Sequence, residues 1–437
     1  MPTTHFANID IAAALAEAQE HYRARNPKSL AQYEEACAAL PGGNTRSAIY
    51  VDPFPLTMAR GEGAHLWDLD GHEYVDFLSE FTAGVFGHSH PAIRRAIDRG
   101  LDGGWNLGAH GAAEAKFAAA ICARFPSIEL VRFTNSGTEA NLMAVAAARA
   151  ITGRDKILVF AGGYHGGVFY FRGKGSVVNA PFEFLLAEYN DIEGTRALIE
   201  PHKGDLAAIL IEPMLGGSGC IPATREFLAD LRALASETGA ILIFDEVMTS
   251  RLAPGGLQEL LGIRPDMTTL GKYVGGGMSF GAFGGRRDLM ERYDPRRPDF
   301  LPHAGTFNNN VLTMAAGIAA LTEVYTPDAA RALNERGDGL RERLAALACK
   351  HGAVVQVTGR GSMINFHMTR EPIRSVAEAR RGNMTIRDLL FFDFLERGLY
   401  MARRGMINLS LPIGAAELDA VAAAFEEFLT VRRNLLD

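Results

Sequence analysis

Short apolar segments recur through the middle of the chain and predict the strands of a buried sheet. Leu206–Ile211 and residues 240–244 are apolar runs without the alternation of a half-exposed strand, so we expect both to be covered on their two faces. Leu130–Phe133 and Lys156–Phe160 are further predicted strands, and an alanine-rich helix runs to about Ala150. Strands covered on both faces are typical of α/β proteins, in which helices pack on a mostly parallel sheet.

The two ends of the chain have a different pattern. Residues from Asp10 to about Ala39 are predicted to be helical, with a break near Pro27. After about Leu321 the pattern becomes helix, two short strands, helix, strand and helix, which predicts an α+β unit without glycine-rich ligand loops. The two short strands are expected at Val354–Thr358 and Ser362–His367.

Composition excludes several classes of function. The 437 residues suggest two domains, and 48% hydrophobic with 22% charged residues allow a large core. A net charge of -7 without any basic run argues against a nucleic-acid partner. No apolar run reaches the roughly 20 residues that span a bilayer, and acidic residues interrupt the alanine-rich start, so neither membrane insertion nor export is expected. Four widely spaced cysteines predict a reducing, cytoplasmic location.

One lysine, Lys272, lies in a run of glycines and apolar residues, 268–285, that contains no other charge. Apolar surroundings favour the neutral amine of lysine, and a neutral amine can attack a carbonyl. A solvated lysine in a flexible loop is the alternative, but the flanking Leu270, Val274 and Phe280 are not the polar residues of a mobile loop. We therefore interpret Lys272 as a Schiff-base lysine.

The buried strand at 240–244 ends in Asp245, an acid where parallel sheets bind ligands. A carboxylate there can pair with a protonated pyridine nitrogen and make the ring an electron sink. Considered without Lys272, Asp245 could be a carboxylate that only reaches solvent at the end of its strand. The position of Lys272 on the next predicted strand and loop favours the joint interpretation.

Ser136, Gly137 and Thr138 follow the predicted strand Leu130–Phe133 and begin the alanine-rich helix. Free amides, the positive end of a helix and a hydroxyl group meet there, which is the composition of a phosphate site. Ser136 and Glu139 also have the spacing of a capping box, so capping alone is the competing interpretation.

Three further side chains are candidates for ligand binding. Tyr164, in a glycine-rich turn after a strand, could stack on a flat heterocycle or simply pack in the core. Arg46 and Arg404 precede apolar segments and could each hold a carboxylate by paired hydrogen bonds, although both could be solvated surface residues. His88 and His90 could bind a metal, but a turn into a helix is the preferred interpretation, and no metal is expected.

Taken together, these segments resemble the class III pyridoxal-phosphate-dependent aminotransferases, from about residue 40 to the end of the chain. The ordering of phosphate loop, acid and lysine is specific to that resemblance. The matching segments are Ser136–Ala140, Gly163–Gly166, Glu212-Pro213, Phe244–Val247, Thr268–Lys272, Gly275–Gly277 and Gly305-Thr306.

Within that class, the chain is similar overall to the glutamate-1-semialdehyde aminomutase branch. It departs from the aminomutases at Met248–Pro254 and at Phe307–Asn310, where they usually have Gly-Phe-Arg and Ser-Gly-Asn-Pro types of sequence. At those positions, and at Arg46, Gly281–Gly285 and Arg404-Gly405, it resembles the β-phenylalanine aminotransferases.

The resemblance implies fold type I: a large α/β domain with a mostly parallel central sheet, a smaller α+β domain from both chain ends, and a homodimer. The expected divisions are residues 1–75 as an N-terminal contribution to the small domain, 76–320 as the large cofactor domain and 321–437 as the C-terminal small domain. The cofactor implied is pyridoxal 5′-phosphate. The implied site residues are Lys272 and Asp245 for catalysis; Ser136, Gly137, Thr138, Tyr164, Val247 and the partner's Thr306 for the cofactor; and Arg46 and Arg404 for substrate carboxylates.

Our leading hypothesis is an aminotransferase that moves the amino group of a β-amino acid, a 3-aryl or 3-alkyl 3-aminopropanoate, to 2-oxoglutarate or pyruvate. The alternative within the resemblance is glutamate-1-semialdehyde 2,1-aminomutase, which returns the amino group to the same carbon skeleton. A binding protein that kept the fold without the chemistry is a third possibility, disfavoured because Lys272 and Asp245 are both present.

Overall fold

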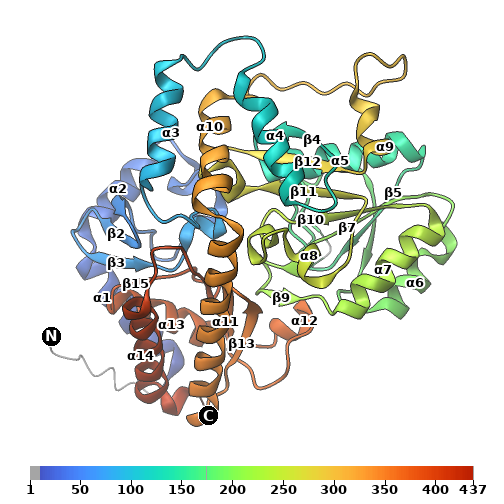
Figure 1. The fold of residues 1–437 in the computed structure, drawn as a ribbon. Helices are drawn as coiled ribbons and strands as arrows, with labels where there is room; N and C mark the ends of the chain where they lie inside the picture. Colours follow the sequence, from blue (N-terminus) through green and yellow to red (C-terminus); the bar gives the residue numbers. More distant parts are fainter. Residues whose placement is uncertain (1–9, 174, 437) are drawn as a thin grey trace.

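A seven-stranded sheet forms the centre of the molecule in a computed structural model that describes residues 10–173 and 175–436 (Figure 1). Five neighbouring strands run parallel, and one strand near the edge, β12, is antiparallel to both of its neighbours. The α/β class expected from the sequence is confirmed. In spatial order the strands are β4 (Leu130–Thr134), β12 (Gly281–Gly285), β11 (Met267–Gly271), β10 (Ile241–Asp245), β7 (Leu206–Ile211), β5 (Lys156–Phe160) and β6 (Glu183–Ala187).

Helices cover both faces of this sheet, which explains why its central strands are apolar throughout. On β7, Ile209 and Ile211 belong to the hydrophobic core under α7 (Arg225–Thr238), whereas Ala208 and Leu210 belong to the core under α5 (Gly137–Thr152). The other helices of this part of the chain are α3 (Pro91–Asp102), α4 (Ala112–Arg124), α6 (Ile192–Ile199), α8 (Leu257–Leu261), α9 (Arg287–Met290) and α10 (Val311–Ala319).

Strand β12 was not predicted, because glycines weaken a strand and do not indicate one. The structure shows why they are needed. A Cβ atom at Gly281 would lie 2.0 Å from the carbonyl oxygen of Ser136, and one at Gly284 would lie 2.6 Å from that of Leu130. Only glycine allows β12 to approach β4 and the start of α5 this closely.

Both ends of the chain contribute to smaller sheets beside the central one. In the first, β15 lies parallel to β3, so residues near 400 pair with residues near 75. The predicted strand Val354–Thr358 is shifted by two residues, because the Val354 amide donates to the Leu436 carbonyl before the ladder begins. The strands are β1 (Met58–Glu62), β2 (His65–Asp68), β3 (Glu73–Asp76) and β15 (Leu399–Tyr400); β13 (Gln356–Arg360), β14 (Met363–His367) and β16 (Met406–Asn408); and the pair β8 (Met214–Leu215) and β9 (Ile221–Pro222).

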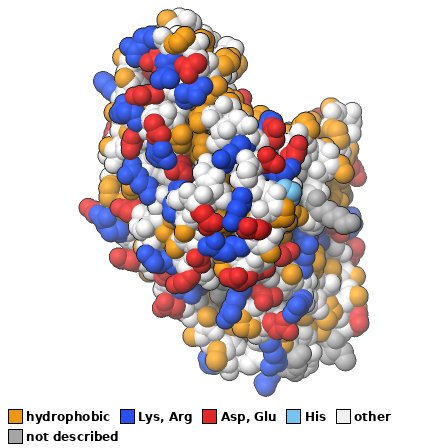
Figure 2. All heavy atoms as spheres, turned by 90° about the vertical axis from the view of Figure 1, so that its right-hand side faces the viewer, with side chains coloured by type: hydrophobic (Ala, Val, Ile, Leu, Met, Phe, Trp, Pro, Cys, Tyr) orange, Lys and Arg blue, Asp and Glu red, His pale blue; other side chains and the backbone are white. Residues whose placement is uncertain are grey.

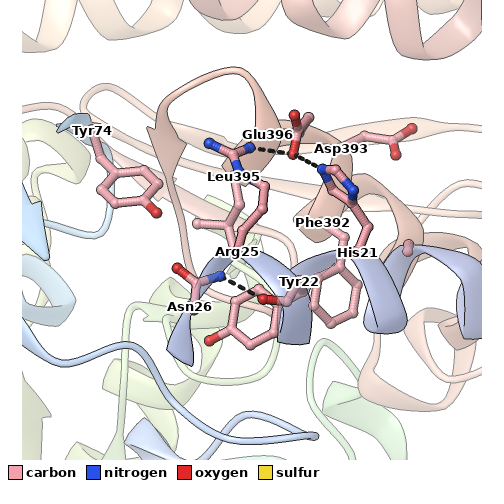
Figure 3. A pocket seen from close by; sticks show the side chains of 10 residues that line it. His21, Tyr22, Arg25, Asn26, Tyr74, Phe392, Asp393, Leu395 and Glu396 are labelled. Atoms are coloured by element: carbon pink, nitrogen blue, oxygen red, sulfur yellow. Dashed lines mark hydrogen bonds and ion pairs between the residues drawn. The ribbon is translucent and has the colours of Figure 1, made fainter. Parts of the chain in front are cut away.

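Helices from the two chain ends pack together, with a small cavity between them (Figure 3). The carboxylate of Glu396 on α13 accepts from Arg25 and lies 3.0 Å from His21 Nε2, both on α1. The predicted helix break is confirmed, since α1 ends at Arg25 and α2 begins at Pro27. The helices are α1 (Ile11–Arg25), α2 (Pro27–Cys37), α11 (Pro327–Lys350), α12 (Val376–Ala379), α13 (Met384–Glu396) and α14 (Ala415–Val431).

Arg251 joins the central sheet to these terminal elements from a fully buried position. Its guanidinium donates to the Thr82 carbonyl at 3.2 Å, to the Ser362 hydroxyl at 3.0 Å and to the Leu409 carbonyl. Burial lowers the pKa of Arg251 below its usual value. The segment Met248–Pro254 therefore connects two parts of the molecule through the side chain of Arg251.

Surface charges of both signs are interleaved on the face that carries α6, α7 and α9 (Figure 2). No continuous basic area appears on this face, in keeping with the net charge of -7. Within residues 10–173 and 175–436, none of the helices has the length and apolar character needed to cross a membrane.

Candidate active site

Lys272 lies directly after β11, in a left-handed backbone conformation with φ of 54°. This conformation is unusual for a residue with a side chain and is common where a functional group is held in place. Burial, with a smaller effect of Arg404, lowers the pKa of Lys272 to about 8, and Asp245 acts in the opposite direction. The amine is withdrawn from solvent, as its apolar sequence surroundings predict, but charged groups from distant segments act on it.

Asp245 ends the neighbouring strand β10 and is buried. Its Oδ2 atom lies 2.8 Å from Nδ1 of His165 and accepts a hydrogen bond from Asn141 at 2.8 Å. Its Oδ1 atom accepts from the Val247 amide at 3.0 Å. Asn141 is itself oriented by Thr269, whose hydroxyl donates to its Oδ1 atom at 2.7 Å. These contacts fix the carboxylate at the carboxyl ends of the central strands.

The predicted phosphate loop begins α5, with Ser136 as the N-cap residue. The Ser136 hydroxyl accepts from the Glu139 amide at 3.1 Å, but the Glu139 carboxylate accepts from Asn135 and not from the N-cap amide. The expected capping box is thus incomplete, because its carboxylate reaches one residue further back. Gly137 and Thr138 occupy the first helical turn, where amides have no acceptor within the helix and can bind an anion.

Val247 connects this loop with the lysine loop. A Cβ atom at Gly137 would lie 2.8 Å from Val247 Cγ2, and one at Gly271 would lie 3.2 Å from Val247 Cγ1. The side chain of Val247 therefore lies against the backbone on which both Thr138 and Lys272 are carried. Glycine at these two positions leaves the space that a larger residue would fill.

Tyr164 is 45% exposed, and its ring meets that of Tyr170 edge to face at 5.3 Å. Its amide donates to the buried carboxylate of Glu212 at 2.9 Å. Burial raises the pKa of Glu212 to about 7. With nearly half of its surface exposed, Tyr164 is not a core-packed residue.

The two candidate arginines share one aromatic neighbour, although they come from opposite ends of the sequence. The guanidinium carbon of Arg46 lies 5.5 Å from the centre of the Phe81 ring, and that of Arg404 lies 5.1 Å from it. Arg46 is exposed and binds Glu80, with 2.5 Å between Nη2 and Oε1. Arg404 is partly buried, and its buried Nε atom has no partner among the described residues.

Thr306 is exposed in an irregular turn before α10. Asn308, two residues later, accepts a hydrogen bond from the side chain of Asn135 at 3.0 Å. The structure therefore brings the turn next to the phosphate loop of its own chain. None of the hydrogen bonds within the described parts of the chain involves the Thr306 hydroxyl.

His88 and His90 have separate structural roles. Nε2 of His88 lies 3.0 Å from the carboxylate of Asp76, and Nδ1 of His90 accepts from the Ala92 amide at the start of α3. The turn expected there is confirmed. Within the described ranges, 10–173 and 175–436, no group of three or more His, Cys, Asp or Glu side chains could hold a metal ion.

The sequence profile of the family "Aminotransferase class-III" matches residues 47–429. The chain belongs to the class III aminotransferases. A β-phenylalanine transaminase of Variovorax paradoxus is 53% identical over 426 residues, covering 98% of this chain and 97% of the relative. A solved β-phenylalanine aminotransferase structure from the same organism has a TM-score of 0.96 and 53% identity and covers 98% of this chain and 99% of that one.

A glutamate-1-semialdehyde 2,1-aminomutase of Rhodopirellula baltica is 38% identical, covering 86% of this aminotransferase and 90% of the relative. The class uses pyridoxal phosphate, and this aminotransferase is a pyridoxal-phosphate-dependent enzyme of fold type I. The residues present fit the cofactor. Neighbouring elements carry the groups that the cofactor needs. These are the buried carboxylate of Asp245, the half-exposed ring of Tyr164, the free amides at the start of α5 and the amine of Lys272 with its lowered pKa.

Sequence reasoning missed three residues of this site. Asn141 and His165 orient Asp245, and Glu212 orients the turn that carries Tyr164. The sequence did indicate Asn141, because it lies four residues after Gly137 and therefore on the same face of the helix as the phosphate loop. His165 and Glu212 were noticed only as parts of matching motifs.

The pKa of Lys272 predicts how the enzyme without cofactor takes up pyridoxal phosphate. Because the neutral amine is the nucleophile, we expect the rate of covalent uptake to rise with pH and level off above about 8. An ordinary lysine would give a rise that continues to about 10.4. Stopped-flow absorbance between pH 6 and 10 measures this rate. A rate still climbing at pH 10 would show that burial and the neighbouring Arg404 and Arg46 do not lower the pKa of Lys272.

Proposed function

We propose that this enzyme transfers the amino group of a β-amino acid, a 3-aryl or 3-alkyl 3-aminopropanoate, to a 2-oxo acid such as 2-oxoglutarate or pyruvate. The observation that carries the proposal is the pair Arg46 and Arg404, which converge on Phe81 and both lower the pKa of Lys272. The two substrates differ in the distance between carboxylate and reacting carbon, so two separate guanidiniums suit them better than one. The extensive similarity to a β-phenylalanine transaminase supports it independently.

The residues that would hold the cofactor follow from the geometry of the site. Ser136, Gly137 and Thr138 would bind its phosphate with amides and hydroxyl groups at the start of α5. Tyr164 and Val247 would cover the two faces of its ring. When bound, pyridoxal phosphate supplies a carbonyl group for the substrate amine and a ring that accepts the electron pair released at the substrate carbon.

The protein's own side chains would then direct the proton transfers. The carboxylate of Asp245, fixed by Asn141 and His165, would keep a proton on the ring nitrogen. The amine of Lys272 would take the proton from the amino-bearing carbon of the donor and deliver it to the cofactor; in the second stage it would move a proton onto the carbonyl carbon of the 2-oxo acid. A pKa of about 8 leaves this amine able both to accept and to donate a proton near neutral pH.

A screen of amino donors with 2-oxoglutarate and pyruvate as acceptors tests the proposed function. Turnover of 3-amino-3-phenylpropanoate with steady consumption of the acceptor is the expected result. If every β-amino acid fails and glutamate-1-semialdehyde is isomerised without an acceptor, the enzyme is instead a glutamate-1-semialdehyde 2,1-aminomutase.

We expect Arg46→Ala and Arg404→Ala to affect the two half-reactions unequally. Each lost charge-assisted contact should weaken binding of the carboxylate that uses it by about 1.5 to 3 kcal/mol, roughly ten- to a hundredfold. Stopped-flow absorbance measures the half-reaction with the β-amino acid and the one with the 2-oxo acid separately. Equal, small effects of both substitutions on both halves would mean that neither arginine binds substrate.

We further propose that the enzyme is a cytoplasmic homodimer in which Thr306 binds the phosphate of the partner's cofactor. The exposed turn at Thr306 and the exposed apolar side chains of Trp105, Leu107 and Phe307 support a contact between two copies at this end of the molecule. The four cysteines are all free, which supports a reducing compartment.

Mixed dimers should reveal whether Thr306 acts across the interface. Thr306→Asp places a negative charge against the phosphate, and Lys272→Ala removes the nucleophile. A dimer with one subunit of each kind has one intact site if Thr306 acts in the partner's site, so mixing should restore activity. If Thr306 acts within its own chain, both sites remain damaged and mixing restores nothing.

A further inference from the structure

The turn Ser79–Thr82 has the most unusual backbone of the described chain outside glycine. Its four residues, none of them glycine, have positive φ values of 50°, 44°, 51° and 84° in succession. Single left-handed residues are uncommon, and such conformations persist where the surrounding structure forces them. The turn therefore places its side chains in positions that an ordinary turn would not provide.

Buried contacts hold this turn on both sides. The carboxylate of Asp76 accepts from the amides of Leu78 and Ser79, both at 2.9 Å. At the other end, Arg251 donates to the Thr82 carbonyl. Ser79 and Thr82 are buried, whereas Glu80 between them is exposed. The fold thus fixes the backbone and leaves the carboxylate of Glu80 in solvent.

Glu80 and Phe81 on this turn both contact the side chain of Arg46. The guanidinium lies beside the Phe81 ring and binds the Glu80 carboxylate, as a substrate carboxylate would bind it. Glu80 is the carboxylate partner of Arg46 among the described residues. Both members of the pair are more than half exposed, with 51% and 57% of their side-chain surface in solvent.

We propose that Glu80 is an internal ligand of Arg46 that occupies the carboxylate subsite without substrate and is displaced by the substrate's carboxylate. The proposal rests on the function proposed above, since it takes Arg46 as a substrate-binding residue. An exposed ion pair is weak, so a substrate carboxylate can displace Glu80 into water at little cost. An amine without a carboxylate leaves the pair intact. Glu80 therefore sets how strongly the enzyme distinguishes β-amino acids from plain amines.

Binding of 3-phenylpropanoate to the holoenzyme tests the displacement without any turnover. This probe carries the carboxylate and aryl group of a β-amino acid but no amine, and calorimetry measures its affinity. Glu80→Gln keeps the size of the side chain and removes its charge, and we expect binding about two- to fivefold tighter. The matched control is Glu62→Gln, which removes the acid of the exposed Arg60–Glu62 pair on β1 and should leave the affinity unchanged.

A double variant separates displacement from simple charge repulsion. If Glu80 competes for Arg46, Glu80→Gln should give no gain in a protein that already carries Arg46→Gln. A gain that persists without Arg46 would mean that Glu80 only repels the probe through space, and the proposal would be wrong. Equal affinity of the wild type and Glu80→Gln, or binding too weak to measure in both, would also overturn it.

Kinetics with two donors connect the binding result to selectivity. One donor is the β-amino acid, 3-amino-3-phenylpropanoate, and the other is a plain amine, 1-phenylethylamine. In Glu80→Gln the Michaelis constant for the β-amino acid should fall about two- to fivefold relative to the Michaelis constant for the plain amine. An unchanged ratio would contradict the role of Glu80 in selectivity. If the wild type turns over no β-amino acid, the proposed function fails, but the affinity for 3-phenylpropanoate still decides whether Glu80 competes for Arg46.

Discussion

Lys272→Ala should abolish transamination while the protein still folds and still binds pyridoxal phosphate. The substitution removes both the nucleophile and the base that moves the substrate proton. General acid–base transfer alone contributes about 10²–10⁴-fold to rate, so we expect activity to fall at least a thousandfold. The variant keeps the residues expected to bind the phosphate and the ring, which are Ser136, Gly137, Thr138 and Tyr164. Equilibrium dialysis should therefore still detect cofactor binding.

Covalent attachment provides the sharpest measurement for this variant. Borohydride reduction followed by mass spectrometry should add the cofactor mass to the wild type but not to Lys272→Ala. A suitable control is Lys156→Ala, at the opposite end of the sheet, where the lysine pairs with Glu183 on the surface. Attachment of the cofactor in Lys272→Ala would place the Schiff-base lysine elsewhere.

Asp245→Asn should give a folded enzyme that reacts very slowly. An amide cannot hold a proton on the ring nitrogen, so the electron pair released at the substrate carbon loses its acceptor. The amide nitrogen also meets donors, because Asn141 and the Val247 amide both donate to the native carboxylate. By analogy with the loss of one electrostatic contact to a transition state, we expect a fall in kcat on the order of 10³-fold.

Asp266→Asn is the matched control, because Asp266 is also buried beside the central sheet but pairs with Arg232 and Arg286 away from the lysine. That substitution should lower stability and leave the absorbance of the bound cofactor unchanged. Asp245→Asn should change this absorbance and kcat together. Near-native kcat in Asp245→Asn would remove Asp245 from the mechanism.

The central sheet could be predicted where burial alone determines the sequence. β7 and β10 are covered on both faces, so they are apolar throughout and were predicted within a residue of their observed bounds. β12 was not predicted, because close backbone contact with its neighbours requires glycine, and glycine does not indicate a strand. β6 is an edge strand, Glu183–Ala187, whose partly exposed residues give no clear periodicity.

The same distinction applies to the site. Lys272 and Asp245 could be found because a lone charge in an apolar segment, or an acid after a buried strand, is visible in the sequence. The positions of Glu80 and Phe81 could not be found in this way, because they depend on four left-handed residues that only the buried surroundings enforce. The proximity of Arg46 to Arg404 was equally invisible, since more than three hundred residues separate them along the chain.

The glycine strand β12 also has a meaning for enzyme engineering. Gly281 lies against the backbone of Ser136, so β12 supports the phosphate loop there by backbone contact and without a side chain. Libraries aimed at new substrates should therefore keep Gly281, Gly284 and Gly285 constant, because a side chain at any of them would collide with neighbouring backbone. Gly42, in the loop before Arg46, has open space around it but a φ of 61°, so this position also favours glycine. Variation for new substrates therefore belongs at side chains that face the site, such as Arg46 and Arg404, and not at the glycines of β12.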